Sequence, residues 1–100
     1  MSDADGRIVI ESITSPHNIQ RVDRAKYMAM REALLPVLPE GPPGVTVAEA
    51  KAKLLNHLSP DLFPGGAKAG WWLKAVQLDL EAKGVIARSD AKPVRLYRCR

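Results

Sequence analysis

Residues 71–88 decide the fold, and they read WWLKAVQLDLEAKGVIAR. They predict a helix over residues 67–83 that Gly84 ends, because glycine readily adopts the left-handed conformation found there. At 100° per residue this helix has two apolar faces, Ala69, Leu73, Val76 and Leu80 on one and Trp71, Ala75, Leu78 and Ala82 on the other. We therefore expect a central helix packed on two sides, with Trp71 in the core and Trp72 partly exposed.

A β-hairpin is predicted to follow this helix. Its strands cover residues 85–88 and 94–98, and residues 89–93 form the turn. Side chains alternate along a strand, so Val94 and Leu96 point to one side and Arg95 and Tyr97 to the other.

Two further helices are predicted upstream. Asp23 is the expected N-cap of the first, which Pro36 and the prolines after it bring to an end. Thr46 and Glu49 have the spacing of a capping box at the start of the second. The second helix ends before Pro60, since the residue preceding a proline avoids the helical conformation.

The N-terminal region adds little regular structure. Residues 1–7 are expected to be disordered, and residues 8–10 (Ile-Val-Ile) predict a short edge strand. The predicted class is α+β, mainly α with a C-terminal β-hairpin, in a single domain over residues 8–100.

The order of helix, short strand, helix, helix and hairpin resembles the winged helix-turn-helix superfamily over residues 20–100. The most specific part is residues 80–86, Leu-Glu-Ala-Lys-Gly-Val-Ile, a run found at the end of the third helix of winged-helix regulators. The chain is also similar to a small uncharacterised bacterial winged-helix family, through residues 21–23 and 70–72. The second resemblance implies no known activity.

The first resemblance implies a DNA-binding protein of the kind that regulates transcription. In such proteins the third helix enters the major groove and the wing contacts phosphate or the minor groove. By position, the implied contacts from the helix are Lys68, Trp72, Lys74 and Gln77, and those from the wing are Arg88, Lys92, Arg95 and Arg98.

The distribution of charge agrees with a polyanionic partner. The formal net charge is +4, yet residues 1–67 hold seven basic and eight acidic side chains, whereas residues 68–100 hold eight basic and three acidic ones. Such asymmetry favours nucleic acid as the partner. A basic surface that only aids solubility, or that protects a strand edge against aggregation, explains the same numbers.

The start of the third helix offers a second possible contact with phosphate. Gly65 and Gly66 provide no side-chain cap, and Lys68 adds a positive charge at the positive end of the helix dipole. A bound phosphate would satisfy the free amides there. Alternatively, water caps the helix and Lys68 points away.

Several classes of function are disfavoured. The single cysteine, Cys99, cannot form an internal disulfide, and His17 and His57 do not have the spacing of a metal site. There is no run of about 20 apolar residues and no signal peptide, so a reducing cytoplasm is expected. No nucleophile with a base and an orienting group is recognisable, so we expect neither an enzyme nor a cofactor.

Other partners remain open, among them a small ligand. A winged-helix module that binds protein, without nucleic acid, would dock through Trp72 and leave the charges to solvent. A homodimer is also possible, with Met28, Met30 and Leu35 of the first helix as the candidate surface, because one copy of a small winged helix usually gives a short DNA contact.

Overall fold

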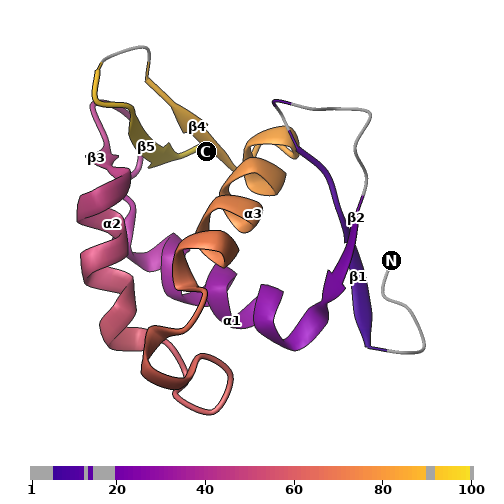
Figure 1. Ribbon diagram of the computed structural model, residues 1–100. Helices are drawn as coiled ribbons and strands as arrows, with labels where there is room; N and C mark the ends of the chain where they lie inside the picture. Colours follow the sequence, from indigo (N-terminus) through magenta and orange to yellow (C-terminus); the bar gives the residue numbers. More distant parts are fainter. Residues whose placement is uncertain (1–5, 13, 15–19, 90–91, 100) are drawn as a thin grey trace.

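A computed structural model describes residues 6–12, 14, 20–89 and 92–99, and within them it shows three α-helices and two small sheets (Figure 1). The α+β class is therefore confirmed. In chain order the elements are β1 (Arg7–Ile10), β2 (Gln20–Asp23), α1 (Arg24–Leu34), β3 (Val45–Thr46), α2 (Val47–Leu54), α3 (Ala69–Ala82), β4 (Ile86–Arg88) and β5 (Arg95–Arg98). Short 3-10 helices lie between them: η1 (Leu35–Val37), η2 (Leu55–His57) and η3 (Pro64–Gly66). No helix in these residues is long and apolar enough to cross a membrane.

The N-terminal sheet pairs β1 with β2 in antiparallel register. The predicted strand at residues 8–10 is confirmed, but β2 was not expected. The assignment of Arg7 to a disordered terminus is wrong, because Arg7 begins β1 opposite Asp23. Residues 1–5, for which disorder was also predicted, lie outside the described part of the chain.

The N-terminal caps predicted for α1 and α2 are confirmed. The Asp23 carboxylate accepts a hydrogen bond from the Lys26 amide at 3.0 Å. At α2 the Thr46 hydroxyl accepts from the Glu49 amide at 3.1 Å, and the Glu49 carboxylate accepts from the Thr46 amide at 2.9 Å. These local bonds fix where both helices begin.

Burial excludes one of the three side chains that we expected to form a dimer surface. Met30 is completely buried in the core, and Met28 and Leu35 are half-buried against it. A side chain already buried within the domain cannot contact a second copy. Dimerisation itself stays a prediction.

The central helix, α3, begins two residues later than predicted. Lys68 takes a left-handed conformation (φ 58°) at the N-cap position, and no side chain caps the helix. At the other end Gly84 (φ 75°) is confirmed as the terminating residue. The Gly84 amide donates to the Glu81 carbonyl and the Val85 amide to the Leu80 carbonyl, the two bonds of a Schellman motif.

The C-terminal sheet has the strand order β3–β5–β4, and all its pairs are antiparallel. The predicted hairpin is confirmed in its strands, although residues 90 and 91 of its turn lie outside the described residues. Gly44 (φ 80°) leads into β3 where the backbones come close, and a Cβ there would lie 2.4 Å from the Leu96 carbonyl oxygen. This position therefore requires glycine.

The core fills the space between α1, α2, α3 and the sheets. One predicted face of α3 is confirmed as buried: Ala69, Leu73, Val76 and Leu80. The prediction that Trp71 lies in the core on the second face is wrong, because Trp71 is 53% exposed. Trp72, which was expected to be partly exposed, is only 7% exposed. In place of that second face, α3 buries three polar side chains, Gln77, Asp79 and Glu81. Each has a hydrogen-bond partner, which offsets part of the cost of burying it.

Candidate functional site

Trp71 is the most exposed large apolar side chain among the described residues. Its ring meets that of Trp72 edge to face, with centroids 5.0 Å apart. Trp72 in turn meets Phe63 in the same way at 6.4 Å. Phe63 and Trp72 are buried, so this row of rings runs from the core to the surface and holds Trp71 in place.

Three lysines lie near this exposed ring. Lys68 precedes α3, and Lys74 is one turn after Trp71 on the solvent-exposed side of the helix. Lys51 of α2 reaches the same region, since its Nζ lies 3.3 Å from the position of a Cβ on Gly70. Within the described chain, no carboxylate forms an ion pair with any of the three. We call Lys51, Lys68, Trp71 and Lys74 the α3 surface.

A pocket of about 350 Å³ adjoins the α3 surface, between α3 and the N-terminal hairpin. Trp71, Lys74, Ala75 and Leu78 line one side. The other side is formed by residues at the end of β1, after it, and at the start of β2: Ile10, Glu11, Ser12, Thr14 and Gln20. Sequence reasoning missed this pocket because β2 was not predicted.

Asp79 is completely buried and ties the N-terminal hairpin to the helices. It accepts hydrogen bonds from the Glu11 amide at 2.8 Å, from Lys83 Nζ at 2.8 Å and from the Tyr27 hydroxyl. Burial, and then the hydrogen bond and charge of Asp79, hold the pKa of Tyr27 well above its ordinary value of 10.0. The sequence showed the Asp79–Lys83 spacing, but no local pattern indicated the other two partners.

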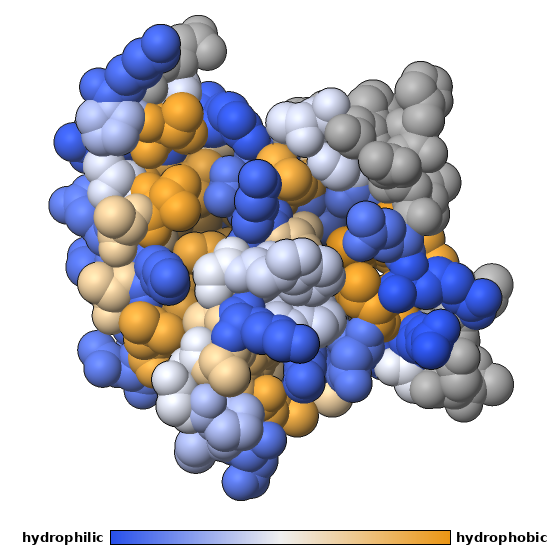
Figure 2. Space-filling view, in the orientation of Figure 1, coloured by the Kyte–Doolittle hydropathy of each residue, from blue (hydrophilic) through white to orange (hydrophobic). Residues whose placement is uncertain are grey.

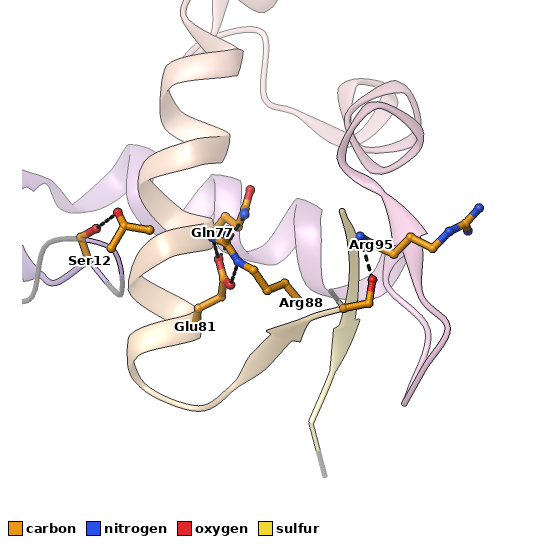
Figure 3. Close-up of polar contacts among 7 residues, drawn as sticks. Ser12, Gln77, Glu81, Arg88 and Arg95 are labelled. Carbon is orange, nitrogen blue, oxygen red and sulfur yellow. Dashed lines mark hydrogen bonds and ion pairs between the residues drawn. The ribbon is translucent and has the colours of Figure 1, made fainter. Parts of the chain in front are cut away.

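Glu81 has the corresponding role for the C-terminal hairpin (Figure 3). Its carboxylate accepts from Arg88 Nε at 2.5 Å and Nη2 at 2.8 Å, and from Gln77 Nε2 at 3.1 Å. The hydrogen bond from Arg88 to Glu81 raises the pKa of the guanidinium. Arg88 and Gln77, two of the predicted DNA contacts, are thus hydrogen-bonded within the protein, although Arg88 is partly exposed.

The other predicted wing contacts do not converge on the α3 surface. The Arg95 side chain extends away from Arg88 and α3 (Figure 3); its Nη1 donates to the Gly44 carbonyl at 3.2 Å and lies 4.0 Å from Glu49. Arg98 Nε donates to the Leu38 carbonyl at 2.9 Å. Lys92 is exposed in the turn.

The predicted residues therefore divide into two groups. Of the four predicted helix contacts, Lys68 and Lys74 are exposed, whereas Trp72 and Gln77 are buried. Trp71 and Lys51 were missed. Hydrophobic and hydrophilic side chains alternate over the face on which α3 lies in front (Figure 2), so this surface is not uniformly basic. In the described part of the chain, no three His, Cys, Asp or Glu side chains are grouped closely enough to hold a metal ion.

The chain belongs to DUF6958, a family of unknown function whose pattern matches residues 7–96. No curated protein and no solved structure matches the chain with significant similarity.

Proposed function

We propose that this protein is a winged-helix domain that binds DNA through the α3 surface. The order α1, β3, α2, α3, β4, β5 supports the winged helix, as does the central position of β5 in its sheet. In this assignment α3 is the recognition helix and the β4–β5 hairpin is the wing.

The observation that carries the proposal is the grouping of cations around an exposed aromatic ring. Lys74 lines the same pocket as Trp71, Lys68 is the N-cap residue of α3, and Lys51 Nζ lies beside Gly70. Among the described residues none of these lysines has a carboxylate partner, and the first turn of α3 contains no acidic residue. Lysines neutralise backbone phosphates, and an exposed aromatic ring is a surface on which bases stack. Lys92 and Arg95 of the wing add two further cations at some distance from this group.

The backbone at Lys68 also supports a role for its charge. A non-glycine residue in the left-handed region is strained by about 1–2 kcal/mol, and glycine avoids that strain. Two glycines, Gly65 and Gly66, already take positive φ just upstream. A lysine at position 68 therefore costs stability, which a function for its side chain would explain.

The test measures binding of labelled DNA by fluorescence anisotropy at several salt concentrations. Contact of the three lysines with three phosphates predicts a log–log salt slope of about −2.7 for duplex DNA and about −2.1 for a single strand. Lys68→Gly should raise stability by about 1 kcal/mol while reducing the magnitude of the slope by about one. A loss of binding that accompanies a gain in stability cannot come from unfolding.

Gly70 provides the matched pair of variants. Gly70→Ala places a methyl group near the flexible Lys51 Nζ and should leave binding unchanged. Gly70→Glu adds an acid at the start of the helix, where it is tolerated, but should weaken binding by about fivefold or more. Equal binding by the two variants, or no DNA binding at low salt, contradicts the proposal.

A protein-binding module is the second candidate. Trp71 and Leu55 are the two exposed large apolar side chains among the described residues. Such side chains often mark protein contacts. This candidate predicts no DNA binding at low salt in the same titration.

A further inference from the structure

The outer side of α3 offers little that could read paired bases. Side chains that recognise base edges in the major groove are mainly Arg, Lys, Asn, Gln and acids. On α3, Gln77 and Glu81 are buried and bonded to each other, and Glu81 also holds Arg88. Between residues 70 and 78 the outward positions are Gly70, Trp71, Lys74, Ala75 and Leu78. This set favours stacking and contact with phosphate over reading of a duplex.

The pocket beside Trp71 has the composition of a site for a planar ring. Ile10, Ala75 and Leu78 provide apolar surface next to Trp71, and Ser12 and Gln20 add groups that donate and accept hydrogen bonds. Glu11 and Thr14 complete the lining, and the hydroxyls of Ser12 and Thr14 are hydrogen-bonded to each other at 3.1 Å. Ser12 lies on the opposite side of α3 from Arg88 (Figure 3). The volume of about 350 Å³ is within the range of about 300–1,000 Å³ that is usual for small-ligand sites.

The tryptophan in this pocket is preorganised. Trp71 rests on the buried Trp72, which rests on the buried Phe63, so few conformations of the ring are lost when a ligand stacks on it. Lys74 lines the same pocket and is exposed. A ligand with a planar ring and a nearby negative charge would use both side chains.

Resting on the DNA binding proposed above, we infer that the pocket takes an unpaired nucleotide of a bound strand. Trp71 stacks on the base, Ser12 and Gln20 contact its edge, and Lys74 neutralises the adjacent phosphate. The protein therefore prefers single-stranded DNA, or a base extruded from a duplex, to fully paired DNA.

The test compares three labelled probes of equal length with the full chain: oligothymidylate, a paired duplex, and a strand whose sugars carry no bases. Oligothymidylate should bind tightest, because the abasic strand keeps the phosphates and loses only stacking. Stacking of one base on an aromatic side chain corresponds to about five- to 150-fold in affinity. Trp71→Ala should lose binding of oligothymidylate by that factor, and Trp71→Phe should retain most of it.

A second variant keeps the test independent of Trp71. Ala75→Leu fills the pocket and leaves the ring and the lysines in place, so it should weaken oligothymidylate binding and not abasic-strand binding. Circular dichroism and denaturation check that each variant is folded. Competition by thymidine monophosphate tests whether the pocket binds a free nucleotide or a nucleotide within a strand. The inference predicts that the free nucleotide competes only weakly.

The outcomes separate the two proposals. Equal affinity for all three probes, with no effect of Trp71→Ala but a loss with Lys68→Gly, overturns the base pocket and leaves DNA binding standing. Competition by the mononucleotide as strong as that by the strand overturns the strand as the source. No binding of any probe at low salt removes both proposals.

Discussion

The two β-hairpins on either side of α3 are held by two carboxylates only two residues apart. Asp79 accepts from the segment after β1, and Glu81 accepts from Arg88 of β4. Two positions on a helix differ by about 200°, so the side chains point to opposite sides, and both are buried. The spacing that prevents these residues from acting as a catalytic pair allows one helix to hold two hairpins.

The two attachments differ in the groups that form them. Asp79 receives a backbone amide, a phenol and an ammonium group. Glu81 receives a bidentate guanidinium and one side-chain amide. The Glu11 donor is a backbone amide, so a substitution of the Glu11 side chain does not remove it. A substitution of Arg88, in contrast, removes both hydrogen bonds between Glu81 and the wing. The N-terminal attachment therefore depends mainly on Asp79 itself, and the C-terminal one depends on both partners.

The largest effect is expected from Asp79→Ala. The variant leaves the buried Tyr27 hydroxyl and the Glu11 amide without their acceptor, and loss of one partner in a buried charged network costs about 3–5 kcal/mol. Urea denaturation measures the change in the free energy of unfolding. Hydrogen exchange at the Glu11 amide should accelerate as the hairpin detaches.

Tyr27→Phe provides the control for that network. In the Asp79→Ala background it removes the unsatisfied hydroxyl, so the two changes should cost less together than the sum of each alone. A cost below about 1 kcal/mol for Asp79→Ala, with unchanged exchange at Glu11, would show that the N-terminal hairpin is held by its apolar contacts.

A smaller effect is expected at the C-terminal attachment. Arg88→Ala leaves the buried Glu81 carboxylate with Gln77 as its described partner, at a cost of about 2 kcal/mol, since the arginine is partly exposed to solvent. Lys83→Ala should cost less than about 1 kcal/mol, because Asp79 keeps two other donors.

Glu81→Gln tests the cause of that difference. It removes the buried charge, so adding it to Arg88→Ala should restore part of the lost stability. If Lys83→Ala proves more costly than Arg88→Ala in the same denaturation experiment, the contrast between the two attachments is wrong.

Local signals predicted much of the fold. The capping box at Thr46, the N-cap at Asp23 and the helix end at Gly84 each depend on a few neighbouring residues, and all three are confirmed. Strand β2 was missed because Gln20–Asp23 buries only Val22, so its formation depends on pairing with β1. Without β2 the pocket beside α3 had only one predicted side.

The candidate site was harder to predict, and the tryptophans show why. Periodicity assigns the more apolar strip of a helix to the core, which placed Trp71 inside and Trp72 outside. The structure reverses them because the strips with Asp79 and Glu81 find partners elsewhere in the chain, at Tyr27 and Arg88. A buried carboxylate with distant donors leaves no periodic signal in the sequence.

A change of pH also separates the two attachments, because only that of Asp79 includes a phenol. The pKa of Tyr27 is raised in the folded protein from an ordinary value of 10.0, so above pH 10 the unfolded chain loses this proton first. The contribution to stability is therefore full below pH 10 and falls by about 1.4 kcal/mol for each pH unit above it. Denaturation between pH 9 and pH 11 measures this slope, on the order of one proton. Tyr27→Phe should show a slope smaller by that proton, whereas Arg88→Ala should keep it. Identical slopes for Tyr27→Phe and the unaltered protein would mean that the phenol ionises equally easily in both states.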